Sequence, residues 1–255
     1  MSILDSFRLD DKVVIVTGAS SGLGVSFAKA FAEAGAHLVL GARRVEQMAG
    51  TAALVEEAGR KVYTRKTDVV DPPEQCQQLV DSAIREFGRV DVLVNNAGVG
   101  TAVPATRETP EQFRKVVDVN LNGSYWMAQA CGRVMQAGSS IINISSILGI
   151  TTGGLPQAAY SASKAGVIGL TRDLAQQWGG PRKGIRVNAL APGFFQSEMT
   201  DEYQPGYLET QLPRVMVGRM GDPAELAATA IWLASAAGGY VTGQTIIVDG
   251  GLTIT

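Results

Sequence analysis

The residues best suited to acid–base chemistry are Tyr160 and Lys164, in the stretch Tyr160-Ser161-Ala162-Ser163-Lys164. Side chains four positions apart lie on the same face of an α-helix. Apolar residues recur at helical spacing around the pair, which predicts a helix here. A free tyrosine ionises at about pH 10, and an ammonium one turn away favours the phenolate and lowers this pKa. Tyr160 is therefore a candidate general acid/base; the alternative is a chance pair on a helix surface.

A glycine-rich stretch, residues 17–24, lies between an apolar run that predicts a buried strand and a helical apolar pattern. Glycines at this junction allow a tight turn, and the first N–H groups of the helix can bind a pyrophosphate. The spacing is Gly-x-x-x-Gly-x-Gly rather than the usual Gly-x-Gly-x-x-Gly, so a purely structural turn is the alternative. The residues predicted to bind phosphate are Gly18, Ser20, Ser21, Gly22, Leu23 and Gly24.

The same stretch also matches a hydrolase pattern. Residues 18–22 read Gly-x-Ser-x-Gly, the pattern of a hydrolase nucleophile elbow. Such an enzyme needs a histidine late in the chain, whereas the only histidine is His37. The sequence therefore excludes this hydrolase chemistry, together with metal sites built from several histidines.

The choice of cofactor depends on the residues after the second predicted strand, Gly41-Ala42-Arg43-Arg44. A carboxylate at this place would bind the ribose hydroxyl of NAD, whereas an arginine would accommodate the additional phosphate of NADP. No carboxylate is present, and a guanidinium can bind a phosphate through two parallel hydrogen bonds. NADP(H), bound by Arg43, is therefore favoured, and NAD(H) is the alternative.

Strand and helix patterns alternate along the whole chain. The predicted strands are residues 12–16, 37–40, 61–66, 90–94, 140–144, 185–190 and 245–248. Helices are expected between them, including one that starts at Asp71-Pro72 and a long one over residues 111–135. Such alternation predicts βαβ units and a parallel sheet. The expected fold class is α/β: a single-domain Rossmann fold (residues 1–255) with a doubly wound parallel sheet and helices on both faces.

Composition limits the classes of partner. Lys+Arg 22 against Asp+Glu 24 gives a net charge of −2, without the basic run that nucleic acid attracts. No apolar run approaches the roughly 20 residues of a membrane helix, and residues 1–11 do not resemble a signal peptide. Cys76 and Cys131 lack the spacing of metal ligands. We expect a cytoplasmic protein with no metal, no nucleic acid and no membrane partner.

Together these features resemble the short-chain dehydrogenase/reductase family over Lys12 to Gly251. Seven motifs stand in the family's order: Thr17-Gly18-x-x-x-Gly22-x-Gly24, Asp68-Val69, Asn95-Asn96-Ala97-Gly98, Asn120, Ser146, Tyr160-x-x-x-Lys164 and Pro192-Gly193. The resemblance implies an enzyme that moves a hydride between a nicotinamide cofactor and a carbonyl or secondary alcohol. It also implies a sheet with strand order 3-2-1-4-5-6-7.

The resemblance implies further contacts to the cofactor. Asp68 and Val69 would lie against the adenine, and Asn95, Ala97 and Gly98 would form the floor beneath the adenosine ribose. The nicotinamide and its phosphate would be held by Pro192, Gly193, the backbone near Phe195 and the hydroxyl of Ser197, where the family often has threonine.

The resemblance assigns four catalytic residues. Tyr160 would donate a proton to the substrate oxygen, or accept it in oxidation, and Ser146 would hydrogen-bond the same oxygen. Lys164 would lower the pKa of Tyr160 and bind the nicotinamide ribose, and Asn120 would hold a water that links Lys164 to solvent. Ser145 is an alternative to Ser146, which we prefer because it directly precedes the turn at residues 147–149.

Residues 194–217 are expected to form a lid over the substrate. Its apolar residues are Phe194, Phe195, Met199, Tyr203, Tyr207, Leu208, Leu212 and Met216, with Leu148 and Leu155 facing them. Its acidic residues are Glu198, Asp201, Glu202 and Glu209, which make an anionic carrier or coenzyme A thioester less suitable. A partly apolar small molecule is favoured, such as a ketone or 3-oxoacyl-like group, while a sugar or steroid is not excluded.

Two functional alternatives stay open. One is an NAD-linked alcohol or sugar dehydrogenase of the same family. The other is a cofactor-binding sensor without turnover, which is disfavoured because Ser146, Tyr160 and Lys164 are all present. By analogy with the family we expect a homotetramer, or a dimer, built through the C-terminal strand and the helices around residues 111–135 and 160–178.

Overall fold

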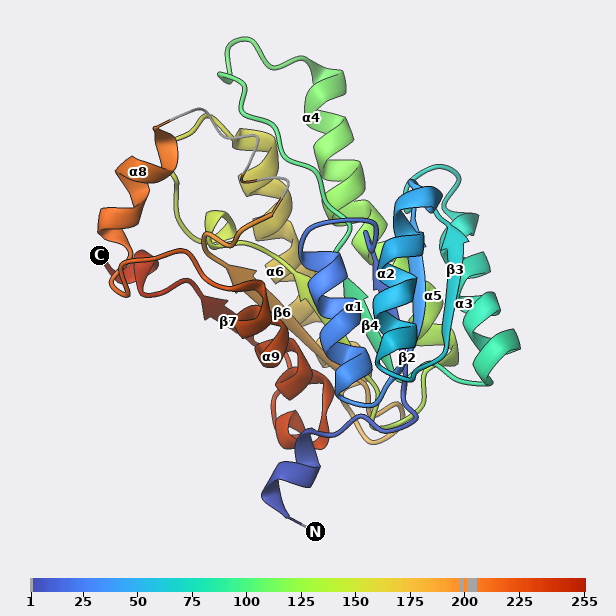
Figure 1. The fold of residues 1–255 in the computed structure, drawn as a ribbon. Helices are drawn as coiled ribbons and strands as arrows, with labels where there is room; N and C mark the ends of the chain where they lie inside the picture. Colours follow the sequence, from blue (N-terminus) through green and yellow to red (C-terminus); the bar gives the residue numbers. More distant parts are fainter. Residues whose placement is uncertain (1, 198–199, 201–205) are drawn as a thin grey trace.

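The computed structural model describes residues 2–197, 200 and 206–255. Seven strands form one sheet in which all neighbours are parallel, in the order β3-β2-β1-β4-β5-β6-β7 (Figure 1). The strands are β1 (Val13–Thr17), β2 (His37–Ala42), β3 (Val62–Lys66), β4 (Val92–Asn95), β5 (Ser140–Ile144), β6 (Arg186–Pro192) and β7 (Thr245–Val248). The order of the strands confirms the predicted doubly wound Rossmann fold.

Helices cover both faces of the sheet. In the described residues the α-helices are α1 (Leu23–Glu33), α2 (Val45–Glu57), α3 (Glu74–Phe87), α4 (Pro110–Val117), α5 (Gly123–Val134), α6 (Ala158–Trp178), α8 (Tyr207–Gln211) and α9 (Pro223–Ala234). Residues of α1, α2 and α9 form one core cluster with one face of the sheet, and residues of α3, α5 and α6 form another with the opposite face. The sheet is therefore enclosed, as all-parallel sheets are.

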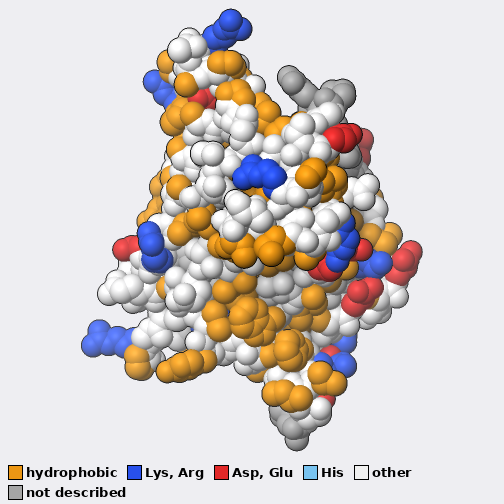
Figure 2. Space-filling model, turned by 90° about the vertical axis from the view of Figure 1, so that its left-hand side faces the viewer, with side chains coloured by type: hydrophobic (Ala, Val, Ile, Leu, Met, Phe, Trp, Pro, Cys, Tyr) orange, Lys and Arg blue, Asp and Glu red, His pale blue; other side chains and the backbone are white. Residues whose placement is uncertain are grey.

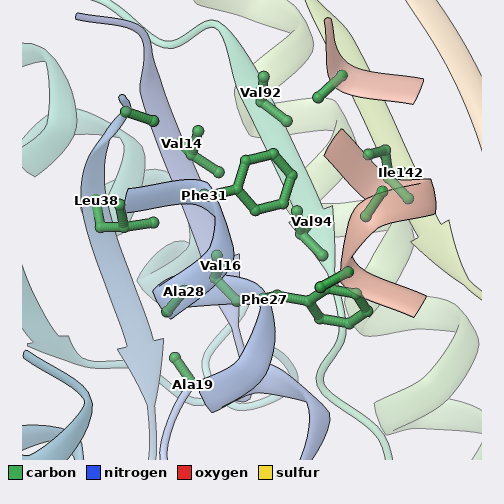
Figure 3. Packing of buried hydrophobic residues seen from close by; sticks show 14 of the residues in the cluster. Val14, Val16, Ala19, Phe27, Ala28, Phe31, Leu38, Val92, Val94 and Ile142 are labelled. Carbon is green, nitrogen blue, oxygen red and sulfur yellow. The ribbon is translucent and has the colours of Figure 1, made fainter. Parts of the chain in front are cut away.

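The alternation of side chains along β1 explains how one strand serves two cores. Successive residues of a strand point to opposite faces. Val14 and Val16 belong to the cluster that contains Phe27 and Phe31 of α1, whereas the neighbouring Ile15 belongs to the other cluster. Figure 3 shows the two phenylalanine rings packed against the valines of β1 and β4. This double burial is why β1 is an uninterrupted β-branched run.

Two helix boundaries differ from the sequence-based expectation. Helix α3 begins at Glu74 with Pro73 as its N-cap, not at Asp71-Pro72. The preceding loop is instead held by Gln75, whose side chain accepts from the Asp68 N–H at 2.9 Å and donates to the Asp71 carbonyl at 2.9 Å. The expected long helix over residues 111–135 is interrupted by a π-helical turn, Asp118–Asn122, between α4 and α5.

The carboxyl ends of the parallel strands all lie at the same edge of the sheet. Strand β1 pairs with β2 on one side and with β4 on the other. The chain therefore builds the sheet outward from β1 in one direction and then, from β4 on, in the opposite direction. Open α/β sheets bind ligands in the crevice at this reversal. None of the helices in the described ranges is long and apolar enough to cross a membrane.

Candidate active site

A cleft of about 630 Å³ runs along the carboxyl ends of the strands, a size within the range of small-molecule sites. Its walls include the glycine loop after β1, the residues after β2, β4, β5 and β6, and one side of α6. Most of the residues predicted from the motifs lie in this wall. The exceptions among the predicted cofactor-binding and catalytic residues are Gly24, Asn95 and Asn120.

The glycine loop has the backbone that its sequence predicts. Gly18 and Gly22 have φ angles of 65° and 55°, a region that glycine adopts without strain. A Cβ on Gly24 would collide with the carbonyl oxygen of Gly18, so Gly24 allows the helix to pack under the loop. The residues of the loop that line the cleft are Gly18, Ser20, Ser21, Gly22 and Leu23.

Asn96 fastens the glycine loop to the end of β4. Its side-chain nitrogen donates to the carbonyl oxygens of Thr17 (3.1 Å) and Gly18 (3.2 Å). In return, the hydroxyl of Thr17 accepts from the N–H groups of Asn96 (3.0 Å) and Ala97 (3.1 Å). Asn96 was not among the predicted cofactor-binding residues, although it lies inside the Asn-Asn-Ala-Gly motif. Ala97 and Gly98 line the cleft beside it.

The neighbouring Asn95 lies beneath the floor of the cleft rather than in it. Its side chain is 2% exposed and donates to the Ser124 carbonyl and to the Asn143 side-chain oxygen, both at 2.9 Å. Asn143 in turn donates to the Thr171 hydroxyl at 3.0 Å. Asn95 therefore ties β4 to α5 and, through Asn143, to α6.

Two arginines stand at one end of the cleft, close to Asp68 and Val69 in its wall. Arg44 donates a hydrogen bond of 2.6 Å to the Ser21 hydroxyl of the glycine loop. The adjacent Arg43 is exposed at the rim. Asp68 accepts from the Val70 N–H at 3.0 Å, which fixes the turn that carries Val69. This end of the cleft therefore presents positive charge beside a small apolar surface.

Tyr160 and Lys164 project from α6 into the cleft, as the four-residue spacing predicts. The Lys164 Nζ lies 5.6 Å from the centre of the Tyr160 ring and donates a 2.8 Å hydrogen bond to the Ile144 carbonyl. Lys164 is 4% exposed, and this burial lowers its pKa to about 8. Near neutral pH the lysine still carries its proton, and a cation so close to a tyrosine favours the phenolate.

The two serines at the end of β5 have different surroundings. The Ser145 hydroxyl donates to the main-chain oxygen of Lys164 at 2.9 Å and so joins the strand to α6. The Ser146 oxygen accepts from the Leu148 N–H at 3.1 Å, within the 3₁₀ turn Ile147–Gly149. Because that bond uses the oxygen as acceptor, the Ser146 O–H can donate to a ligand. Both serines line the cleft, but only Ser146 offers a donor to it.

Asn120 sits in the π-helical turn between α4 and α5 and is fully buried. Its side-chain oxygen accepts from the Val99 N–H at 2.8 Å, and its nitrogen donates to the Val99 carbonyl (2.9 Å) and the Ser163 hydroxyl (3.0 Å). A Cβ on Gly98 would lie 3.4 Å from this side-chain oxygen and 3.5 Å from the Lys164 Nζ. The structure thus brings Asn120 near Lys164, but its side chain is engaged in holding the Val99 backbone.

The far end of the cleft is formed by the residues after β6. Pro192, Gly193, Phe194, Phe195 and Ser197 line it. The Ser197 N–H donates to the Thr200 hydroxyl at 2.9 Å, and that hydroxyl donates to the Ser197 carbonyl at 2.8 Å. Thr200 also lines the cleft and was not predicted; its signal, a hydroxyl residue three positions after Ser197, is weak in a single sequence.

The predicted lid can be followed only in part. Glu198, Met199, Asp201, Glu202 and Tyr203 lie outside the described residues. Met216 is 66% exposed and Glu209 is exposed, and neither lines the cleft. Tyr207, Leu208 and Leu212 pack on an apolar cluster around Tyr160, whereas Phe195 belongs to the cluster beneath α1 and α9. The cluster around Tyr160 comprises Val116, Ile147, Leu148, Ala159, Tyr160, Phe194, Val215 and Leu252. This end of the cleft is therefore largely apolar.

Metal ligands do not gather at this site. In the part of the chain that the structure describes, there is no group of three or more His, Cys, Asp or Glu side chains able to hold a metal ion. Three groups of the cleft are suited to proton chemistry beside a reacting oxygen: the Tyr160 hydroxyl, the Ser146 hydroxyl and the buried Lys164 ammonium.

Comparison with known proteins agrees with this geometry. The family model described as enoyl-(acyl carrier protein) reductase matches residues 18–253. The chain is 40% identical to 3-oxoacyl-[acyl-carrier-protein] reductase of Thermotoga maritima, over 97% of this chain and 100% of that one. The chain belongs to the short-chain dehydrogenase/reductase family. It is an NAD(P)-dependent oxidoreductase.

The chain is also similar to other members of the short-chain dehydrogenase/reductase family. Galactitol 2-dehydrogenase (L-tagatose-forming) of Cereibacter sphaeroides is also 40% identical, over 97% of each chain. Among solved structures, a short-chain type dehydrogenase/reductase from Mycobacterium marinum superposes with a TM-score of 0.94 at 33% identity, covering 100% of both chains. The relatives therefore agree on the reaction class and differ in substrate.

Several neighbouring structures contain a nicotinamide cofactor. A gluconate 5-dehydrogenase from Burkholderia cenocepacia, in complex with NADP and tartrate, has a TM-score of 0.92 at 35% identity over 100% of both chains. A 7α-hydroxysteroid dehydrogenase complexed with NADH and 7-oxo glycochenodeoxycholic acid has a TM-score of 0.92 at 30% identity over 98% of both chains. The family neighbours thus include structures with each of the two cofactors.

Proposed function

We propose that this protein is an NADP(H)-dependent oxidoreductase that interconverts a ketone, of simple or 3-oxoacyl type, and a secondary alcohol. One observation carries the proposal: a single cleft presents Ser146, Tyr160 and Lys164 at one end and Arg43 at the other. We take residues 1–255 as one domain and residues 194–217 as its substrate lid. The described residues fit a dinucleotide, because Gly18 and Gly22 form a tight turn directly before α1, whose first N–H groups can bind a phosphate.

The described residues supply the proton chemistry. The nicotinamide, when bound, supplies or accepts the hydride. Tyr160 donates its hydroxyl proton to the substrate oxygen during reduction, and Ser146 donates a hydrogen bond to the same oxygen. Lys164 holds a positive charge beside the tyrosine ring, which stabilises the phenolate left after proton transfer. Asn120 keeps the Val99 backbone beside Lys164. We propose that a water held at the π-helical turn of Asn120 links Lys164 to solvent.

The proposed preference for NADP(H) rests on charge. Arg43 and Arg44 follow β2, and the position before them is Ala42 rather than a carboxylate. Arg44 is held by Ser21, which keeps its charge beside the phosphate loop. Arg43 would bind the 2′-phosphate, while Asp68 and Val69 would contact the adenine. The NADP-bound gluconate 5-dehydrogenase is consistent with this assignment.

The proposed substrate class rests on the lining of the far end. Leu148 and Phe194 give it an apolar wall, which suits an alkyl or acyl chain. A sugar or polyol is the second candidate, because Thr101 and Gln157 also line the cleft and the Thr101 hydroxyl is buried without a hydrogen-bond partner. A buried polar group without a partner is costly, and a substrate hydroxyl would satisfy it. The galactitol dehydrogenase relative is consistent with this second candidate.

We also propose that the protein assembles into a homotetramer, or a dimer, in the cytoplasm. Strand β7 lies at the edge of the sheet, where an apolar strand readily pairs with another chain. Ile247 on β7 is 42% exposed, and Tyr240 just before it is fully exposed. Figure 2 shows apolar side chains gathered across this side of the molecule. The free thiols of Cys76 and Cys131, both buried, are typical of a reducing compartment.

The experiment that tests the function compares two probes with two cofactors. Reduction of ethyl acetoacetate by NADPH and NADH, and oxidation of galactitol by NADP⁺ and NAD⁺, are followed by absorbance in the wild type and in Tyr160→Phe. We expect ketone reduction with NADPH and a loss of about 10²–10⁴ in kcat in the variant. Galactitol oxidation alone would favour the polyol candidate. Cofactor binding without turnover of any probe would favour the sensor.

A further inference from the structure

Tyr207, the first residue of α8, joins two walls of the substrate end of the cleft. Its hydroxyl donates a 2.7 Å hydrogen bond to the main-chain oxygen of Gly153. Its ring meets the Phe194 ring edge-on, with centroids 6.0 Å apart and planes at 79°. Edge-on contacts of this kind are favourable beyond the area they bury. Two segments far apart in the sequence are therefore held by one side chain.

The loop that Tyr207 contacts connects two catalytic residues. Residues 150–157 join the 3₁₀ turn that follows Ser146 to the start of α6, which carries Tyr160. Within this loop, the Gly153 carbonyl accepts the Tyr207 bond, and the Val103 N–H donates to the Pro156 carbonyl at 2.8 Å. A change in the position of this loop would move the wall beside the substrate oxygen.

The contact is tightly packed. A Cβ placed on Gly153 would lie 3.1 Å from the Tyr207 hydroxyl and 3.0 Å from a methyl carbon of Leu148. Leu148 lines the cleft, as does Phe194 on the other side of the tyrosine ring. Tyr207 itself is half-buried behind these two side chains. It thus supports both apolar walls without forming the surface that a substrate would touch.

We propose that Tyr207 is a positioning residue that determines which substrates fit. Its hydrogen bond to Gly153 and its contact with Phe194 set the separation of Leu148 and Phe194, and hence the width of the substrate end. This inference rests on the proposed function, since it assumes that the substrate binds beside Tyr160. It assigns substrate selection in part to Tyr207, which lies behind the cleft wall. Substitution of Tyr207 should change which substrates fit while leaving the acid–base residues in place.

The variant Tyr207→Phe tests this by removing only the hydroxyl. We expect the KM for ethyl acetoacetate to rise about 2- to 10-fold, because one neutral hydrogen bond is lost. The kcat and the NADPH dissociation constant should stay near their wild-type values, because no residue of the cofactor end changes. The KM for the bulkier ethyl benzoylacetate should rise less than the KM for ethyl acetoacetate, since a widened site accommodates the larger ketone.

Hydrogen exchange provides a readout that does not need turnover. Amide exchange in segments 150–157 and 206–217 should be faster in Tyr207→Phe than in the wild type, with NADPH present in both. The matched control is Tyr125→Phe on α5, which loses only a hydroxyl that accepts a 3.3 Å hydrogen bond from Gln129 and keeps the aromatic ring, whose centre lies 4.9 Å from that of Trp126. This control should match the wild type in KM and in exchange of both segments.

The outcomes separate this inference from the proposed function. If the wild type reduces ketones and Tyr207→Phe keeps its KM, its preference between the two esters and its exchange pattern, the role of Tyr207 is overturned. If the wild type reduces no ketone, the proposed function fails, and the exchange comparison alone decides whether Tyr207 holds the loop. Gly153→Ala should reproduce the KM increase, because its methyl group would displace the Tyr207 hydroxyl.

Discussion

The hydroxyl of Ser145 donates a 2.9 Å hydrogen bond to the main-chain oxygen of Lys164. This bond fixes the end of β5 against the turn of α6 that carries the buried ammonium. The adjacent Ser146 is left with its O–H available to the cleft, because its oxygen already accepts from the Leu148 N–H. Two neighbouring serines therefore divide the structural role and the proposed catalytic role between them.

This division predicts opposite effects for two alanine variants. Ser146→Ala should lower kcat about 10²–10³-fold, as the loss of one oxyanion donor typically does. Ser145→Ala should instead reduce the free energy of unfolding by about 1 kcal/mol and keep most of the turnover. Steady-state kinetics and urea unfolding of both variants provide the measurement. A large loss of kcat in Ser145→Ala with normal stability would reverse our assignment.

The buried ammonium of Lys164 predicts a dependence of stability on pH. Burial lowers its pKa to about 8, whereas an unfolded lysine ionises at about pH 10.4. Between these values the unfolded chain binds more protons than the folded chain, so the contribution of Lys164 to the free energy of unfolding rises with pH. Below this window both states are protonated, and the full cost of burying the cation is present.

The measurement compares the wild type with Lys164→Met by urea unfolding at about pH 7 and about pH 9.5. The wild type should gain stability relative to the variant at the higher pH. Groups that titrate equally in both proteins contribute equally to the two free energies of unfolding, so their effect cancels in the difference. If the wild type and Lys164→Met differ in free energy of unfolding by the same amount at both pH values, Lys164 keeps an ordinary pKa in the folded protein.

Gly149 links the serine turn to α6, and a methyl group there should separate them. A Cβ at this position would lie 2.7 Å from the Lys164 carbonyl carbon and 2.9 Å from the Ala165 nitrogen, both backbone atoms. Gly149→Ala should therefore displace Ser146, lower kcat at least about 10-fold and destabilise the fold by about 1–3 kcal/mol. As a matched control, Gly50→Ala on α2 meets nothing within 4 Å and should stabilise the protein by about 0.5–1 kcal/mol. Equal kcat in the two variants would contradict this role for Gly149.

The fold was predictable because its signals are local. Runs of β-branched residues such as 13–16 identify buried strands, and glycine turns separate them from amphipathic helices. The order of the strands came from the family resemblance and not from any single pattern. Helix periodicity could not reveal the π-helical turn at Asp118–Asn122, because the apolar pattern continues through it.

The site was predictable at the level of motifs but not of side-chain direction. Asn95 and Asn96 are adjacent in one motif, yet Asn95 points into the protein and Asn96 holds the glycine loop. Nothing in the local sequence distinguishes them, since which face is buried depends on the helices packed there. Similarly, the bond between Tyr207 and Gly153 joins residues 54 positions apart, a separation at which sequence pattern carries no signal.

The proposed assembly predicts that a charge on the edge strand produces smaller species. Ile247→Glu would place a carboxylate in an interface that must bury an apolar strand, which is strongly unfavourable without a partner. Light scattering after gel filtration should show the wild type as a tetramer or dimer and the variant as a smaller species. Val45→Glu on α2 is the control, because Val45 has almost the same exposure, 43% against 42%. An unchanged mass for Ile247→Glu would place the interface elsewhere.

Arg43 should account for the preference between the two cofactors. Arg43→Ala should weaken NADPH binding about 10- to 100-fold, because charge-assisted hydrogen bonds to a phosphate contribute about 1.5–3 kcal/mol. NADH binding should change little, since NADH lacks that phosphate. Fluorescence titration of each cofactor measures both affinities. Equal losses for NADPH and NADH would show that Arg43 acts on a part common to the two molecules.

Ala42→Asp tests the same preference from the opposite direction. Ala42 ends β2 and lines the cleft, at the place where a carboxylate can bind a ribose hydroxyl. The new carboxylate should repel the 2′-phosphate of NADPH and accept hydrogen bonds from the ribose of NADH. Combined with Arg43→Ala, it should reverse the preference, whereas Arg44→Ala should have a smaller effect because Arg44 is already bonded to Ser21. If the double variant still prefers NADPH, the 2′-phosphate is bound by residues other than those at the end of β2.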